Sequence, residues 1–480
     1  MSMHVKQENR SWFGLLLGPV VMLMIIILPA PAGLSEASWL TIGLTFWMAS
    51  WWITEAVPIP VTSFLPLVVA PLLRINHINA VAVSYAHPLI FLFMGGFMLS
   101  IAMERWSLHK RIALKTMLLT GSKPSQQIAG IMLVTAFLSM WMSNTATTVM
   151  MLPIGLSIIQ MTQTDEQTDA PYNKALLLSI AYAASIGGLA TLIGTPPNAL
   201  MAAYLNENFH IKISFARWML VGIPLTVLLL FSTWLWLTQM FYQVDKNATR
   251  CSKVTFRLQL NELGPVKREE TAVLIIFALT ALAWMFRPLI AKITGLPLDD
   301  TIIAMLSASL LFACPIDRHN RRLLKWKDAT KVPWGVLLLF GGGLSLAGLI
   351  KSSGLADYIA LQVEALDAMP LWLMTIIVVT VIVFLTEITS NTATAAGFLP
   401  LLGPIAMSIS NTPMTLVIPA AIAASCAFMM PVATPPNAII FSSGQLRIAD
   451  MAKTGLMLNL IAIFWISLLG LTLVRWVLNF

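Results

Sequence analysis

Two apolar stretches of this sequence carry the same dense cluster of polar side chains. Residues 137–153 read FLSMWMSNTATTVMMLP and residues 384–400 read FLTEITSNTATAAGFLP, so Ser-Asn-Thr-Ala-Thr recurs in register 247 residues later. In hydrocarbon every hydroxyl and amide needs a partner, and Asn and Thr favour turns and caps over helix interiors. The duplication therefore predicts two matching interruptions that form two halves of one binding site.

The sequence around these clusters is that of an integral membrane protein. Of the 480 residues, 58% are hydrophobic and 10% are charged, whereas soluble proteins average roughly 25% charged residues. The net charge of +8 falls in short blocks, which is typical of membrane orientation and not of nucleic-acid binding. Cys251, Cys314 and Cys426 are far apart, which gives neither a disulfide framework nor a metal motif.

Runs of about 20 apolar residues predict an all-α polytopic membrane protein with about eleven transmembrane helices. The two polar stretches, within 130–160 and 370–408, are counted as re-entrant hairpins and not as spans. The first run is longer than the apolar core of a signal peptide, so it is counted as a span. The expected spans are 12–30, 39–57, 61–73, 88–103, 175–203, 218–241, 271–290, 301–314, 333–350, 415–441 and 454–478.

The basic residues predict the orientation. If six blocks lie on one side of the membrane, that side holds 22 of the 29 Lys and Arg residues, and the positive-inside rule makes it the cytoplasm. We therefore expect a multi-pass protein of the cell inner (plasma) membrane with its N-terminus in the cytoplasm and its C-terminus outside. The six blocks are 1–11, 104–124, 161–174, 242–270, 315–334 and 442–453.

The duplication extends beyond the two clusters. Thr-Pro-Pro-Asn interrupts an apolar run at 195–198 and again at 434–437, and Phe-x-Gly-Gly-x-x-Leu occurs at 93–99 and 340–346. A basic block follows the first Gly-Gly helix but precedes the second, so the two helices run in opposite directions if both blocks are cytoplasmic. That pattern predicts an inverted-topology repeat, an architecture of alternating-access carriers.

The interruptions suit small ions and carboxylates. Pro-Pro removes two backbone donors and breaks a helix, which frees carbonyl oxygens for a cation. Helix N-termini, hydroxyls and amides offer neutral donors to an anion. Neither cluster contains Arg or Lys, so anion binding would depend on bound cations, as symport requires. Glu55 and Glu387 each follow a Thr near a helix end, which favours a structural hydrogen-bonding role over ion binding but leaves both open.

The chain resembles the divalent anion:sodium symporter family, which is related to solute carrier family 13 in animals. The resemblance rests on both Ser-Asn-Thr motifs, both Pro-Pro-Asn breaks and the Thr-Glu-Ala-x-Pro sequence at 54–58. It implies an elevator-type homodimer with scaffold and transport domains. The expected divisions are 1–124 (scaffold helices and the start of repeat 1), 125–241 (first hairpin, broken helix and following span), 242–270 (cytoplasmic linker), 271–369 (scaffold helices of repeat 2) and 370–480 (second hairpin, broken helix and last span).

The resemblance also implies site residues, carried across by motif. Two sodium sites would use side-chain oxygens together with a backbone oxygen from each broken helix: Ser139, Ser143, Asn144 and Gly194 in one, and Thr386, Thr389, Ser390, Asn391 and Ala433 in the other. The substrate carboxylates would meet Asn144, Thr145, Thr195, Asn391, Thr392 and Thr434.

We therefore expect a sodium-coupled importer of C4 dicarboxylates such as succinate, malate or fumarate, with no organic cofactor. A sodium-independent dicarboxylate exchanger of the same family is the alternative. A polytopic membrane enzyme would need clustered His, Asp, Glu or Cys, which the scattered residues do not supply. A channel is disfavoured by the paired broken helices. The sequence leaves open dicarboxylate against tricarboxylate or sulfate, and the number of sodium ions.

Overall fold

A computed structural model describes residues 2–121, 123–162, 170–244, 253–316, 321–363 and 369–478. Within these ranges the chain is helical, and an isolated bridge between Pro315 and Arg322 is the sole β-type pairing. The predicted all-α class is therefore confirmed. Parts of the predicted cytoplasmic blocks 1–11, 104–124, 161–174, 242–270 and 315–334 lie outside the described residues.

The helices of the first half follow the predicted apolar runs, with short helices between them. They are α1 Ser2–Ile27, α2 Glu36–Thr54, α3 Ile59–Thr62, α4 Leu65–Leu72, α5 Ile78–Val83, the 3-10 turn η1 Ser84–Ala86, α6 Pro88–Arg105, α7 Leu108–Leu119, α8 Pro124–Ser139, α9 Asn144–Thr162, α10 Ala170–Gly188, α11 Pro196–Phe209, α12 Phe215–Leu235 and the π-helical turn η2 Trp236–Phe241.

The second half begins with an amphipathic helix inside the predicted linker and then returns to apolar helices. Its elements are α13 Lys253–Glu262, α14 Arg268–Met285, α15 Arg287–Thr294, α16 Asp300–Ala313, the 3-10 helix η3 Trp326–Lys331, α17 Trp334–Ser352, α18 Leu355–Val363, α19 Leu371–Leu385, α20 Asn391–Ser410, α21 Met414–Ala423, α22 Pro435–Phe441, α23 Ile448–Leu471 and α24 Leu473–Leu478.

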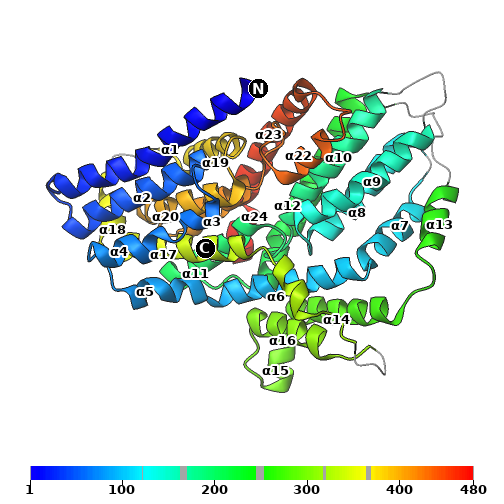
Figure 1. Ribbon diagram of the computed structural model, residues 1–480, viewed down its shortest axis with the longest axis horizontal. Helices are drawn as coiled ribbons and strands as arrows, with labels where there is room; N and C mark the ends of the chain where they lie inside the picture. Colours follow the sequence, from blue (N-terminus) through cyan, green and yellow to red (C-terminus); the bar gives the residue numbers. More distant parts are fainter. Residues whose placement is uncertain are drawn as a thin grey trace.

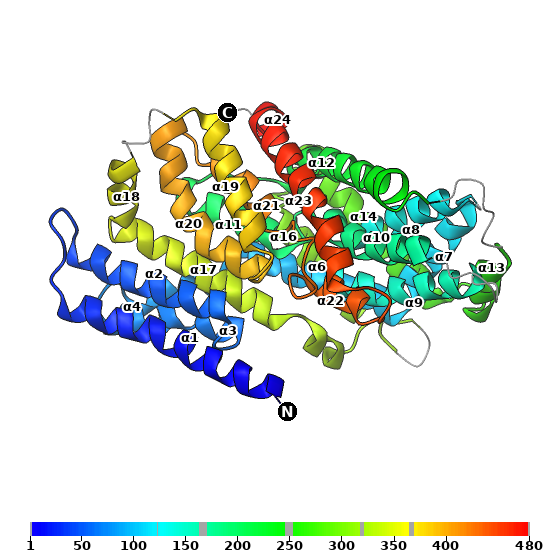
Figure 2. The same cartoon turned by 90° about the horizontal axis from the view of Figure 1, so that it is seen from above.

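The helices form an elongated bundle (Figure 1). α1 packs against α2 at one end, whereas α8, α9 and α10 pack together at the other end beside α7 and α13. α17 lies between these ends and contacts both α11 and α20. The two chain ends lie at opposite edges when the molecule is seen from above (Figure 2).

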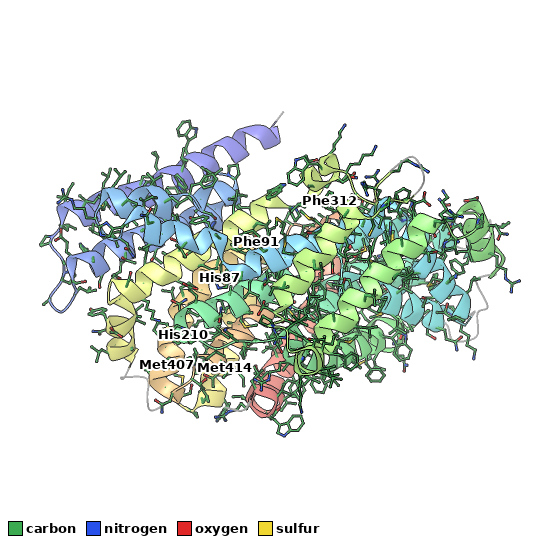
Figure 3. All side chains as sticks on the ribbon, turned by 90° about the horizontal axis from the view of Figure 1, so that it is seen from below. His87, Phe91, His210, Phe312, Met407 and Met414 are labelled. Carbon is green, nitrogen blue, oxygen red and sulfur yellow. The ribbon has the colours of Figure 1, made fainter. Side chains whose placement is uncertain are left out.

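Apolar side chains cover the outside of several helices. Figure 3 shows side chains projecting all around the ribbon. On α14, four apolar side chains are each more than 40% exposed: Leu274, Ile275, Leu279 and Leu282. Large apolar side chains also stand outward on α1, α12 and α23. Such extensive exposure of apolar surface is typical of a protein that lies in lipid.

The number of spans is only partly evident from helix length. Among the described residues, five helices are long and apolar enough to cross a membrane, or six if α14 and α15, bent by 84°, form one span. α16 has 14 residues, which corresponds to about 21 Å against a hydrocarbon core of about 30 Å. The expected spans 175–203 and 415–441 are each divided into two helices, α10 and α11 in the first and α21 and α22 in the second. The count of eleven therefore stays a prediction.

The repeated Gly-Gly helices meet at the centre of the bundle. Phe93 on α6 and Phe340 on α17, which occupy matching places in the two copies, pack edge to face with ring centroids 5.2 Å apart. The Gly pairs allow close approach of neighbouring helices: a Cβ atom at Gly95 would lie 2.8 Å from the Ala304 carbonyl oxygen on α16. The matching segments of the two halves thus lie next to each other.

Candidate functional site

Each Ser-Asn-Thr motif forms the turn between two helices. α8 ends at Ser139 and α9 begins at Asn144, while α19 ends at Leu385 and α20 begins at Asn391. Within each pair the two helices pack against each other. The predicted interruption of both apolar stretches is therefore confirmed, and it falls at the same place in each copy.

Matching hydrogen bonds join each turn to the end of the helix that packs on it. Ser139 Oγ donates to the Ala184 carbonyl oxygen at 2.6 Å, and Thr386 Oγ1 donates to the Ala424 carbonyl oxygen at 2.9 Å. Asn391 Oδ1 lies 2.8 Å from Thr386 Oγ1 and is a second acceptor for the same hydroxyl proton. The change from Ser to Thr between the copies keeps the hydroxyl and its backbone partner.

The Asn144 amide lies among three other oxygens: Ser139 Oγ at 2.7 Å, the Ala184 carbonyl at 3.1 Å and the Gly194 carbonyl at 3.3 Å. With its nitrogen turned toward them, the two N–H donors of the amide have all three oxygens within hydrogen-bond distance. With its oxygen turned toward them, the Ser139 hydroxyl is the one donor among four converging oxygens, an arrangement that a bound cation would stabilise. This side chain can therefore supply either hydrogen bonds or a cation ligand at one point.

Both Thr-Pro-Pro-Asn motifs break a helix, as predicted. α10 ends at Gly188 and α11 begins at Pro196, while α21 ends at Ala423 and α22 begins at Pro435. Thr195 and Thr434 precede the new helices with nearly identical extended dihedrals, φ −142° and ψ 139° for the first and φ −141° and ψ 149° for the second. Since Pro lacks an N–H, it fits the first turn of a helix, and the preceding residue is pushed into extended conformation.

The Asn of each Thr-Pro-Pro-Asn motif holds the unwound segment before it. Asn198 Nδ2 donates to the Thr191 carbonyl at 2.9 Å, and Asn437 Nδ2 donates to the Met430 carbonyl at 3.0 Å. Both side chains are fully buried. Neither Asn198 nor Asn437 was among the predicted site residues, although their position in the repeated motif was a signal that could have identified them.

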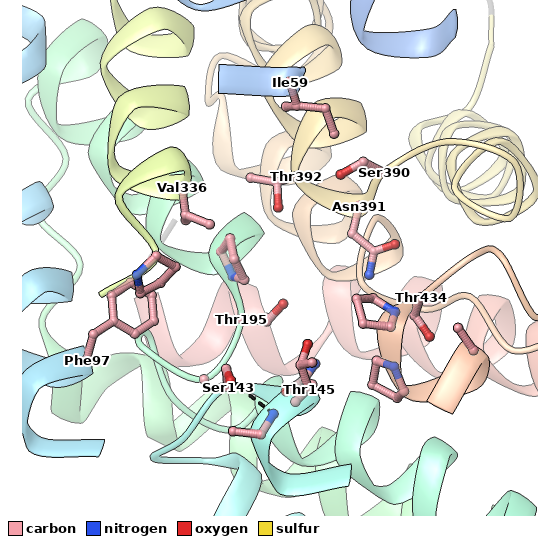
Figure 4. Close-up of a pocket in the computed structure, with 18 of the residues that line it drawn as sticks. Ile59, Phe97, Ser143, Thr145, Thr195, Val336, Ser390, Asn391, Thr392 and Thr434 are labelled. Atoms are coloured by element: carbon pink, nitrogen blue, oxygen red, sulfur yellow. Dashed lines mark hydrogen bonds between the residues drawn. The ribbon is translucent and has the colours of Figure 1, made fainter. Parts of the chain in front are cut away.

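One cavity of about 850 Å³ brings the four motifs together (Figure 4). The labelled side chains Ser143, Thr145, Thr195, Asn391 and Thr434 point into the same space from different helices. All six predicted substrate-binding residues line this cavity, as do seven of the nine predicted sodium-site residues: Ser143, Asn144, Gly194, Thr389, Ser390, Asn391 and Ala433.

The other two predicted sodium-site residues, Ser139 and Thr386, lie behind the cavity wall and bond to Asn144 and Asn391. Contact between the halves is direct, because Thr195 Oγ1 and Ser425 Oγ lie 3.2 Å apart. Ser425 was not predicted as a site residue, although an Ala-Ser pair precedes each break, at 184–185 and at 424–425. The predicted site residues thus lie in the wall of one cavity or directly behind it. Their roles in binding stay predictions.

Glu387 is a structural hydrogen-bonding group in the second half. Its side chain is buried, with 4% exposure, and accepts from three consecutive backbone N–H groups at 428–430, at 2.7, 2.9 and 2.9 Å. Asn459 Nδ2 donates to the same carboxylate at 2.8 Å. Glu55 differs, since it is exposed, adopts a left-handed φ of 49° at the end of α2 and lines the cavity.

Comparison with known proteins places this architecture in a family. Residues 9–479 match the family described as the sodium:sulfate symporter transmembrane region. The chain belongs to this family. Because the match spans almost the whole chain, it confirms the resemblance to divalent anion:sodium symporters inferred from the motifs.

Curated relatives of this symporter-family chain are similar over nearly their full length. The protein named sodium-dependent dicarboxylate transporter SdcS of Staphylococcus saprophyticus is 41% identical over 479 residues, which cover 96% of this chain and 92% of the relative. The protein of the same name from Staphylococcus aureus is 43% identical over 460 residues, covering 94% and 88%.

Solved structures of more distant transporters share the fold. The Alcanivorax borkumensis YdaH transporter is 16% identical, with a TM-score of 0.57 and coverage of 97% of this chain and 98% of that one. Neisseria gonorrhoeae MtrF, described in the context of antimetabolite efflux pumps, is 12% identical, with a TM-score of 0.59 and 97% coverage of both chains. At these identities the likeness concerns the fold alone.

Proposed function

We propose that this protein is a sodium-coupled secondary transporter that imports a C4 dicarboxylate such as succinate, malate or fumarate across the cell membrane. The observation that carries this proposal is the single cavity lined by both Ser-Asn-Thr turns and both Thr-Pro-Pro breaks. The names of its relatives from Staphylococcus support sodium and a dicarboxylate as the two solutes.

Two sodium sites would lie at the two turns. In the first, the Asn144 oxygen would join Ser139, Ser143 and the Gly194 carbonyl. In the second, Asn391 would join Thr386, Thr389, Ser390 and the Ala433 carbonyl. Hydroxyl, amide and carbonyl oxygens are hard ligands that suit a small alkali cation. The oxygens of Ser139, Ala184 and Gly194, which all lie within 3.3 Å of the Asn144 amide, support the first site most directly.

The dicarboxylate would lie between the two sodium ions. Its carboxylates would accept from neutral donors at the starts of α9, α20 and α11, where helix N-termini add positive potential. These donors come from Asn144, Thr145, Thr195, Asn391, Thr392 and Thr434. Since none carries a charge, the attraction for a dianion would come mainly from bound sodium. Each solute would then raise the affinity for the other, which couples their transport.

The transport cycle would be an elevator motion built on the inverted repeat. The proposed arrangement has eleven spans, two re-entrant hairpins and a homodimer, with the N-terminus in the cytoplasm and the C-terminus outside. Hairpins and broken helices, within 125–241 and 370–480, would form the transport domain. Segments 1–124 and 271–369 would supply the scaffold helices, with 242–270 as the cytoplasmic linker. The matching hydrogen bonds of the two halves support the repeat.

Replacing sodium by choline is expected to lower succinate affinity at least 100-fold. Without cations in the cavity, the dianion would meet only neutral donors and lose the Coulomb attraction of two nearby charges. Succinate binding to the purified protein, measured by calorimetry in each salt at equal ionic strength, tests this expectation. Equal affinity in both salts would contradict symport and favour the sodium-independent exchanger.

Single cysteines at Asn411 and Lys327 are expected to react with a membrane-impermeant maleimide from opposite faces. Both residues are exposed, Asn411 at the end of α20 and Lys327 on η3. In the proposed topology the first is outside and the second is cytoplasmic. The three native cysteines are replaced beforehand, and intact cells are compared with inside-out vesicles. Labelling of both positions in intact cells would overturn the proposed topology.

A further inference from the structure

The charges that line the cavity are unevenly distributed. The four motif segments, 143–146, 193–196, 388–392 and 432–438, form a neutral wall without any Asp, Glu, Lys, Arg or His. The charged lining residues Glu55, Glu104 and Lys331 come from other elements, together with apolar residues such as Phe97 and Val336. Figure 4 shows Phe97 and Val336 across the cavity from Thr434. We call this second set the charged wall.

Lys331 is the sole basic residue of the charged wall among the described residues. It ends η3, and its ammonium makes no hydrogen bond or ion pair within the described ranges. Its side chain is exposed, so it stands at the mouth of the cavity and not in its depth. This free ammonium is the one cationic side chain that the described cavity lining offers to an approaching anion.

The backbone under Lys331 is fixed by an ion pair. Asp328, within η3, accepts from Arg105 at the end of α6 and from the backbone N–H of Lys325. Trp106 Nε1 donates to the Leu323 carbonyl at 2.9 Å, which ties the segment before η3 to the same helix end. These contacts hold η3 against the cavity, while the flexible Lys331 side chain remains free to reach into its mouth.

We propose that Lys331 recruits the substrate dianion to the mouth of the cavity and thereby sets its apparent affinity from that side. The inference rests on the proposed function. Because protein walls of low dielectric constant focus the field, one ammonium there raises the local concentration of a dianion. Glu55 and Glu104 on the same wall would attract sodium but repel the dianion, so Lys331 supplies the local attraction that offsets their repulsion. An exposed Lys adds attraction without tight binding, so the requirement for sodium inside the cavity is preserved.

The test compares Lys331→Glu with Lys327→Glu. Lys327 is exposed on the same 3-10 helix but on a different face, and it does not line the cavity. Both variants change the net charge equally at the same end of the molecule. Succinate transport is measured from the face where Lys331 lies, using inside-out vesicles for the cytoplasmic face, at saturating sodium. Choline chloride then raises the ionic strength from the lowest workable value to about 0.5 M, where the Debye length falls to roughly 4–5 Å.

Lys331→Glu is expected to raise the KM for succinate about three- to tenfold at low ionic strength, with the maximal rate unchanged. This is the size expected when a charge reversal acts on a dianion about one Debye length away. In about 0.5 M choline chloride the difference from wild type should shrink below twofold. Lys331→Met should give an intermediate effect, and Lys327→Glu should match wild type.

Two results would overturn the role of Lys331. One is an equal KM for Lys331→Glu and Lys327→Glu at low ionic strength. The other is a difference that persists unchanged at high salt, since a structural defect is not screened. Omitting sodium in the same assay tests the proposed function separately: sodium-independent uptake by the wild type would contradict symport, while the comparison of the two lysine variants would still be valid.

Discussion

Asn391→Ala should reduce sodium-dependent succinate transport at least 100-fold. Asn391 begins α20 and accepts from Thr386. In the proposed site its amide oxygen coordinates sodium and its amide nitrogen donates a hydrogen bond to the substrate. Loss of two contacts to charged partners, each contributing about 1.5–3 kcal/mol, corresponds to a factor of about 100 or more. Asn144→Ala should have an effect of the same order. Uptake of labelled succinate into proteoliposomes measures both variants.

Two further variants give this experiment its controls. Asn261→Ala on α13 removes an exposed amide outside the cavity and should transport like wild type. Asn391→Asp keeps an oxygen for sodium but replaces the donor by a negative charge. It should retain sodium binding, measured by calorimetry, while losing succinate binding through repulsion. Normal transport by both Asn144→Ala and Asn391→Ala would contradict a binding site at the two turns.

The sequence was sufficient to locate the turns and breaks, because their causes are local. Pro-Pro at 196–197 has no donors for a helix interior, so α11 must begin there. Asn144 and Asn391 begin helices because polar groups near a chain turn satisfy exposed backbone groups. The grouping of these motifs into one cavity followed from the duplication, since neither copy encloses a site by itself.

The charged wall could not be predicted in this way. Lys331 and Glu104 lie within basic blocks whose composition indicates only a side of the membrane. Their position beside the cavity depends on how α6 and η3 pack, through Asp328, which no local pattern encodes. The number of spans likewise cannot be derived from helix length, because the two helices of a broken span, such as α21 and α22, are each too short to cross the bilayer.

The role of Glu387 is another consequence of packing. Its position in the first half is occupied by Met140, where the turn is held by neutral bonds: Thr191 Oγ1 donates to the Met140 carbonyl at 2.5 Å and accepts from Gly194 N–H at 3.0 Å. In the second half the carboxylate of Glu387 takes the place of that hydroxyl. It fixes segment 428–430, which leads directly into Ala433 and the second break.

Glu387→Met, which installs the residue of the first half, should abolish transport. Three backbone N–H groups would lose their acceptor in a buried segment, at about 1–3 kcal/mol each. The thermal midpoint of the purified protein should fall clearly, and that fall alone would indicate only a structural role. Glu387→Gln separates the two effects, because it keeps an acceptor oxygen and the shape of the side chain.

Glu387→Gln should remain folded, with a melting temperature within a few degrees of that of the wild type. Its sodium half-saturation should nevertheless rise about tenfold, because a loosened 428–433 segment no longer holds the Ala433 carbonyl in place, and one lost charge-assisted bond contributes about 1.5–3 kcal/mol. Thr191→Val is the matched control: it loosens the first site through a neutral bond and should raise the half-saturation less. If Glu387→Gln keeps wild-type sodium dependence, the carboxylate supports folding alone and has no part in positioning the second ion.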